Sequence, residues 1–177
     1  VYILSGRKVR LLTTRIVFEM FLEKAKDTTG QDFRELVDFF ELKPGERTEF
    51  RPNQWITVRN NFHPIPAIGY LIETPWGPMS YSGDTFYDPE KLQALVDEKV
   101  LTPERRDEIM NLIWKEGSVV RHEQGVPPIH TPRTVLEEVA KGRPEGQMVL
   151  VHTPKAPDSP GIHVADSFEQ KVIFEGM

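Results

Sequence analysis

The chain has 177 residues, of which 22 are basic and 27 are acidic, so its formal net charge is −5. This length is enough for one domain with a hydrophobic core, and the acidic balance excludes an overall basic footprint for nucleic acid. The absence of cysteine excludes disulfides and cysteine-metal sites, and no apolar run approaches the roughly 20 residues of a membrane span, so we expect a cytoplasmic protein.

The first half of the chain is predicted to contain short strands and two helices. Residues 9–12 form a strand, and the apolar stripe of residues 15–26 predicts a helix that Thr14 caps. Residues 33–40 are predicted to form a second, shorter helix. After a turn at residues 43–46, strands are predicted at 47–50, 55–58, 68–73 and 79–81.

Helices and strands alternate in the second half. Three helices each start at a capping side chain followed by proline, at Asp88-Pro89, Thr102-Pro103 and Thr131-Pro132. Early antiparallel strands followed by this alternation predict a mixed sheet layered with helices. The helices are expected at 90–98, 104–114 and 133–140, the strands at 119–121, 148–151 and 172–174, and a long loop at 155–161.

Three residues with metal-binding side chains each follow a predicted strand, namely His63, Asp84 and His152. Imidazole and carboxylate groups suit zinc-class ions, and loops at strand ends leave room for water, so the three form a candidate hydrolytic metal site. Each also has a simpler interpretation. His63 can be a turn residue, Asp84 can cap backbone amides locally, and His152 can be a hydrogen-bonded structural residue.

A second pair of polar residues flanks a proline-containing loop. Glu123 precedes the loop and His130 follows it, directly before Thr131-Pro132. A helix that starts there puts His130 beside free amides and the positive end of the helix dipole, which favour an anion such as phosphate. His130 can then donate a proton or a hydrogen bond to that phosphate. The alternative is a rigid loop with Glu123 as a surface charge.

These segments resemble the second half of a metallo-β-lactamase-fold hydrolase of the ribonuclease Z-like branch. The resemblance rests on a His before a Gly-Tyr strand (63–70), Ser-Gly-Asp-Thr (82–85), His-Glu followed by His-Thr-Pro (122–132), and His152 after a late strand. The sequence of residues 122–132 resembles that of a subgroup that carries a cyclic-nucleotide-binding domain on the same polypeptide. The loop 124–129 is shorter than in tRNA-processing members, which argues against tRNA as substrate.

The resemblance implies an α+β, layered fold: a metallo-β-lactamase αβ/βα sandwich that is incomplete, with residues 1–177 as the C-terminal portion of a single domain. The His-x-His-x-Asp-His motif of the first half is absent, and the chain begins at Val1 rather than Met. We therefore expect a piece of a longer protein whose upstream residues carry the remaining metal ligands. Phe50, Trp55 and Ile56 should then lack part of their cover, as an exposed apolar patch or a surface filled by a second chain.

By the same resemblance, His63, Asp84 and His152 would hold two divalent metal ions, with Asp84 bridging; zinc is expected, with manganese or iron as alternatives. A metal-bound hydroxide would attack the substrate, and His130, oriented by Glu123, would stabilise the leaving group or the phosphoryl charge.

The predicted function is a metal-dependent phosphodiesterase of ribonuclease Z-like type, with a small-molecule or nucleotide phosphodiester as substrate. Two alternatives stay open: a thioester, lactone or β-lactam hydrolase, and a non-catalytic regulatory module that keeps the fold. A homodimer is also compatible with the sequence. His163 matches no motif and is interpreted as a loop residue.

Overall fold

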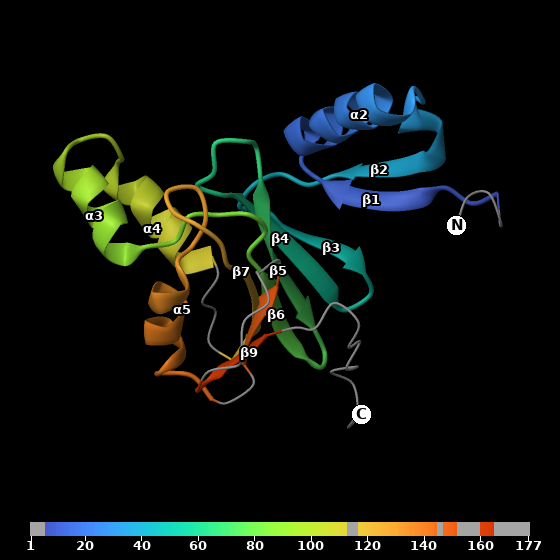
Figure 1. Ribbon diagram of the computed structural model, residues 1–177. Coiled ribbons are helices and arrows are strands. Elements are labelled where there is room, and N and C mark those ends of the chain that lie inside the picture. The colour runs from blue at the N-terminus through green and yellow to red at the C-terminus, as the bar shows by residue number, and fades with distance from the viewer. Residues whose placement is uncertain (1–5, 113–116, 145–146, 152–159, 165–177) are drawn as a thin grey trace.

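The computed structural model describes residues 6–112, 117–144, 147–151 and 160–164 (Figure 1). Within these residues, no helix is both long and apolar enough to cross a membrane. The first elements are β1 (Val9–Thr13), α2 (Arg15–Thr29), a 3₁₀ turn (Phe33–Leu36), β2 (Val37–Glu41), β3 (Arg47–Arg51), β4 (Gln54–Asn60) and β5 (Ile68–Thr74). They are followed by β6 (Gly77–Tyr81), α3 (Pro89–Asp97), α4 (Pro103–Leu112), β7 (Val119–Glu123), α5 (Arg133–Ala140), β8 (Met148–Val151) and β9 (Ile162–Val164).

The main sheet has seven strands in the order β3-β4-β5-β6-β7-β8-β9. Strands β3 to β6 are antiparallel neighbours, which short turns can connect. Strands β6 to β9 are parallel, and α3, α4 and α5 occupy the connections between β6, β7 and β8. Figure 1 shows these three helices on one side of the sheet, with β1, β2 and α2 as a separate layer on the other side. The predicted mixed sheet layered with helices is confirmed.

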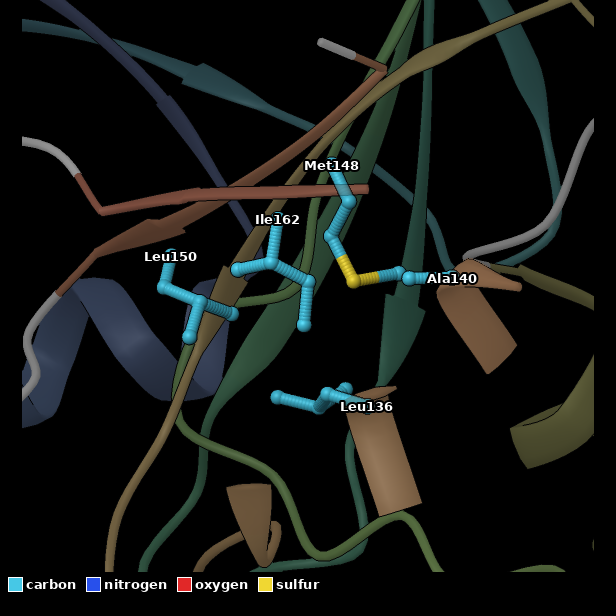
Figure 2. Packing of buried hydrophobic residues seen from close by; sticks show 5 residues of the cluster. All are labelled: Leu136, Ala140, Met148, Leu150 and Ile162. Atoms are coloured by element: carbon cyan, nitrogen blue, oxygen red, sulfur yellow. The ribbon is translucent and has the colours of Figure 1, made fainter. Parts of the chain in front are cut away.

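One hydrophobic core lies between α5 and the parallel end of the sheet. Figure 2 shows Leu136 and Ala140 of α5 facing Met148, Leu150 and Ile162 of the last two strands. Leu136, Met148 and Leu150 have no solvent exposure. Strands that are covered by helices and paired on both sides are typically near-continuous apolar runs, which explains the sequence Met-Val-Leu-Val of β8. This core fixes β8 and β7, and therefore the loop that follows β7.

A second core joins β4 and β5 to the small layer of β1, α2 and β2. It is built on Ile56, Val58 and Ile68, which are buried together with Leu42. Tyr70 of β5 also donates a hydrogen bond from its hydroxyl to the carbonyl of Leu12 at 3.2 Å. The small layer is thereby attached to the antiparallel part of the main sheet.

An apolar hollow of about 350 Å³ lies beside this core, on the face of the main sheet opposite α5. Its lining consists of Leu12, Phe50, Ile56, Tyr70, Ile72, Met79, Tyr81 and Arg121. Phe50 and Ile56 both line this hollow; Phe50 is half-buried and Ile56 is 5% exposed. The expectation that an upstream part of the fold covers them stays a prediction. Trp55 is half-buried, and the Arg47 guanidinium lies 4.0 Å from the centre of its ring.

The predicted helix at residues 33–40 is wrong. Only Phe33–Leu36 is helical, as a 3₁₀ turn, and Val37–Glu41 is strand β2. All five residues of β2 pair in parallel with β1, and Phe39 stacks on Phe18 of α2 with ring centres 4.0 Å apart. Pairing and ring packing are tertiary effects that override the local helical pattern.

The interpretation of His163 as a loop residue is also wrong, because His163 is the middle residue of β9 and pairs with Val149 of β8. A three-residue strand is too short to produce a detectable alternation. The predicted strand at 172–174 lies outside the described residues.

The predicted capping side chains divide into two groups. Asp88 accepts a hydrogen bond from the N–H of Lys91, and Thr102 accepts one from Arg105, as expected. Thr14 occupies the cap position of α2 but makes no capping hydrogen bond. The cap of α5 is Pro132, so the prediction that Thr131 caps this helix is wrong. The hydroxyl of Thr131 instead donates to the carbonyl of Thr85.

Candidate active site

The loops that carry the predicted site residues leave the same edge of the main sheet. Strand β5 is antiparallel to both β4 and β6, so β4 and β6 run in one direction. Strands β7 and β8 are parallel to β6 and share that direction. The carboxyl ends of β4, β6, β7 and β8 therefore meet at one edge, where loops leave room for a ligand. Glu123 is the last residue of β7. His63 lies three residues after the end of β4, and Asp84 lies three residues after the end of β6.

His63 is positioned by its own loop. Its Nδ1 lies 3.1 Å from the carbonyl oxygen of Ile65 and 3.3 Å from the N–H of the same residue. Its Nε2 is buried and has no hydrogen-bond partner among the described residues. In the tautomer in which Nδ1 donates to the carbonyl of Ile65, Nε2 carries the lone pair, which is the arrangement common to histidines that bind a metal through Nε2. In the other tautomer Nδ1 accepts from the N–H of Ile65 and Nε2 carries the proton.

Asp84 lies in a loop that the side chain of Asn61 fixes to the end of β4. The amide of Asn61 donates to the carbonyls of Ser82 and Asp84, at 2.7 and 2.8 Å. The backbone of Gly83 has φ +59°, and a Cβ there would lie 2.3 Å from the carbonyl oxygen of Ile68. Glycine is therefore required both for the conformation and for the close approach. The Asp84 loop is held against the loop that carries His63.

Glu123 and His130 form a hydrogen-bonded pair in which Glu123 is buried and His130 is partly exposed. Oε2 of Glu123 lies 3.0 Å from Nδ1 of His130, and the Glu123 side chain is 2% exposed against 21% for His130. An ionised carboxylate only accepts hydrogen bonds, so Nδ1 carries the proton in this pairing. The alternative interpretation of Glu123 as a surface charge is wrong, because Glu123 is among the most buried polar residues.

The remaining oxygen of Glu123 is also fully engaged. Oε1 accepts hydrogen bonds from the backbone N–H groups of Thr85 and Thr131, at 3.2 and 3.3 Å. The backbone N–H of Glu123 donates to the hydroxyl of Ser82 at 2.9 Å. These contacts tie the end of β7 to the Asp84 loop, so the carboxylate that orients His130 is itself fixed at both oxygens.

Thr131 joins the two loops from the other side. Its hydroxyl donates to the carbonyl of Thr85 at 2.9 Å and accepts from the N–H of Tyr87 at 3.0 Å. Its side chain has no solvent exposure. The residue that follows His130 is thus attached to the segment that follows Asp84. As a result, His130 comes close to His63, with ring centres 5.5 Å apart.

Burial sets the direction of the pKa shifts at this edge. Desolvation raises the pKa of the Glu123 carboxyl, and the amides of Thr85 and Thr131 offset part of this effect. Burial also raises the pKa of the Tyr81 hydroxyl, and the negative charges of Asp84 and Glu123 add to that rise. Because its pKa is raised, Tyr81 is a neutral hydrogen-bond donor near both carboxyl groups. It reaches solvent, since 39% of the residue is exposed.

The described residues contain part of the predicted metal site. His63 and Asp84 lie on adjacent loops, while His152 lies outside the described residues. Within the part of the chain that the structure describes, no group of three His, Cys, Asp or Glu side chains is arranged to hold a metal. The buried Nε2 of His63 and the carboxylate of Asp84 are nevertheless donors that suit a zinc-class ion.

Asn61 and Ser82 were not identified from the sequence as part of this site, and Thr131 was expected only as a helix cap. They are short polar or small residues near strand ends, a type that commonly bonds to nearby backbone in turns. Such a signal predicts a loop and does not identify the distant carbonyl or carboxylate that each residue contacts.

No protein-family model matches the chain. Among solved structures, the chain resembles the metallo-β-lactamase fold protein YhfI from Bacillus subtilis, with a TM-score of 0.57 at 12% sequence identity. The alignment covers 90% of this chain and 63% of YhfI. This chain has the metallo-β-lactamase fold. The seven-stranded sheet with its helices on one side is therefore part of that fold, as the sequence predicted.

Two curated proteins from Dictyostelium discoideum are also similar to this metallo-β-lactamase-fold chain. One is the cAMP/cGMP-dependent 3',5'-cAMP/cGMP phosphodiesterase B, 32% identical over 140 residues, which are 77% of this chain. The other is the cGMP-dependent 3',5'-cGMP phosphodiesterase A, 32% identical over 158 residues, which are 85% of this chain. The chain spans only 13% and 17% of the lengths of these two relatives.

Proposed function

We propose that the chain contributes the C-terminal part of the catalytic domain of a metal-dependent phosphodiesterase of ribonuclease Z-like type, and that its substrate is a cyclic nucleotide. The observation that carries this proposal is the hydrogen bond between His130 and the buried Glu123, beside His63 at the edge of the sheet where the strands end. The names of the two Dictyostelium relatives, both cyclic-nucleotide phosphodiesterases, support the substrate class. A cyclic-nucleotide-binding domain elsewhere on the full-length protein is part of the same proposal.

His63, Asp84 and His152 are the residues that would hold the divalent metal ions. The buried Nε2 of His63 supports the assignment, because burying a nitrogen lone pair without a partner is unfavourable unless a ligand occupies it. A zinc-class pair bound there would supply Lewis-acid activation of water and neutralise charge on the phosphoryl oxygens.

His130 is proposed to act on the leaving group. Glu123 holds Nδ1, so the proposed acid is the other ring nitrogen, Nε2. A proton or hydrogen bond from Nε2 to the departing oxygen would lower the cost of its developing negative charge. The buried carboxylate stabilises the positively charged imidazolium and keeps the ring in one orientation, which is the usual function of a third group behind a catalytic histidine.

The test separates proton transfer from metal binding. In the full-length, metal-loaded protein, His130→Ala should keep its metal content and lose roughly 10²–10⁴-fold in turnover of cyclic nucleotides, the usual range for a positioned acid or base. Asp84→Ala should lose metal and activity together. His163→Ala is a matched control, since His163 lies in β9, two strands from the Glu123–His130 pair, and should change neither.

Four other outcomes would contradict parts of the proposal. Loss of metal in His130→Ala would make His130 a ligand. Full turnover of cyclic nucleotides in His130→Ala would remove the leaving-group role of His130. No turnover of cyclic nucleotides in the parent protein, with turnover of a panel of thioesters, lactones or β-lactams, would favour one of those hydrolases. Less than one metal ion per chain in the intact protein, with no turnover of any of these substrates, would favour the non-catalytic module.

A further inference from the structure

The backbone of Gly125 leaves no room for a side chain beside His130. A Cβ built on Gly125 would lie 2.7 Å from Cβ, 2.8 Å from Cγ and 3.2 Å from Cδ2 of His130. Carbon atoms in contact are normally about 3.5–4.0 Å apart. The backbone of Gly125 is not in the left-handed region, so its φ angle does not require glycine. The contact with His130 does.

The surrounding loop cannot easily relieve a clash at this position. The N–H of Gly125 donates to the carbonyl of Thr131 at 3.2 Å, and the N–H of His130 donates to that of Val126 at 3.4 Å. Thr131 is in turn attached to the Asp84 loop. A side chain at position 125 would therefore move the His130 ring, whose Nδ1 is held on the other side by Glu123 at 3.0 Å.

We propose that Gly125 is a positioning residue for the imidazole of His130. Its missing side chain lets the loop backbone pack directly against the ring, so the ring is held between Gly125 and the Glu123 carboxylate. This inference rests on the proposed function, since it gives Gly125 a purpose only if His130 acts in turnover. The expected effect of a side chain here is a ring displaced relative to His63 and the substrate, with the metal ligands left in place.

The first experiment compares Gly125→Ala with Gly142→Ala in the full-length, metal-loaded protein. Gly142 is the matched control because it also lies outside the left-handed region and a Cβ there would meet no atom within 4 Å. Gly125→Ala should lower kcat for cyclic nucleotides by about 10–100-fold with metal content unchanged, since a misplacement of about 1 Å can cost 10²-fold. Gly142→Ala should match the parent protein.

The second readout does not depend on activity. The ¹⁵N chemical shifts of the His130 ring report the hydrogen bond from Nδ1 to Glu123. Gly125→Ala should shift the Nδ1 signal toward the value of an imidazole without that bond, and Gly142→Ala should not. An unchanged ring spectrum in a folded Gly125→Ala protein would overturn the inference.

A double variant keeps the proposal testable if Gly125→Ala does not fold. His130→Gly removes all three atoms that a Cβ at position 125 would meet. Adding His130→Gly to Gly125→Ala should then restore folding. The double variant should keep the residual turnover of His130→Gly alone, because two residues that act through one contact are not additive. Equal loss in both backgrounds would show that Gly125 serves the loop rather than the ring. Loss of turnover in His130→Ala with full turnover in Gly125→Ala would overturn this inference and keep the proposed function.

Discussion

Lowering the pH from 7 to 5 should destabilise this protein through His122, which precedes the Glu123–His130 pair in β7. His122 has no solvent exposure. Burial lowers the pKa of its imidazole from 6.5 to about 4, and a hydrogen bond with the carbonyl of Glu123 offsets this only in part. The folded state therefore holds the neutral ring, whereas the unfolded chain takes up a proton below pH 6.5.

The sign and size follow from proton linkage. A group with a lowered folded pKa contributes stability that is complete above its unfolded pKa and is lost as the pH falls toward the folded one. With a folded pKa of about 4 for His122, the free energy of unfolding should fall by about 2 kcal/mol between pH 7 and pH 5. Burial of Glu123 acts in the opposite direction, because its raised carboxyl pKa makes stability fall as the pH rises.

A variant isolates the contribution of His122 from that of the carboxylates. His122→Asn keeps a donor near the position of Nδ1 but does not titrate, so its packing cost is the same at both pH values. Urea denaturation of both proteins is followed by tryptophan fluorescence at pH 7 and at pH 5. The fall of about 2 kcal/mol in the free energy of unfolding should appear only in the parent protein. The same loss in both proteins would refute the reasoning, as would an NMR titration in which His122 protonates near pH 6.5.

Two further predictions concern stability. Leu136→Ala should lower the free energy of unfolding by about 2–5 kcal/mol in urea denaturation, since Leu136 is fully buried in the core of α5, and Ile65→Ala, at an exposed position, should cost little by comparison. Gly83→Ala should cost clearly more than Gly117→Ala in the same assay, because both glycines have positive φ but only a Cβ at Gly83 would strike backbone, the carbonyl oxygen of Ile68. Gly117→Ala should cost about 1–2 kcal/mol, the left-handed penalty alone, and equal costs would show that the contact at Gly83 relaxes freely.

The candidate site could be predicted in its parts but not in its connections. Metal-binding and acid–base residue types after apolar strands, together with the resemblance to metallo-β-lactamase-fold hydrolases, selected His63, Asp84, Glu123 and His130, and the catalytic and ligand roles given to them stay predictions. What the pattern missed was the set of contacts that fixes them. That Thr131 would bond to Thr85 rather than cap a helix depends on two loops that meet only after β6 and β7 have paired.

The sequence by itself determined the elements whose signals are local. Proline with a capping side chain marks the start of α3 and α4, and apolar runs between turns mark β4 to β8. These features are decided by backbone geometry and burial within a few residues, so they can be seen without the fold.

Only the tertiary structure decided the rest. Residues 37–41 became strand β2 because β1 offered a partner and α2 an aromatic ring, and His163 became part of β9 because β8 offered an edge. The need for glycine at position 125 is of the same kind. It arises because the loop folds back and brings the His130 ring, five residues further along the chain, against Gly125. A local sequence pattern does not predict that contact.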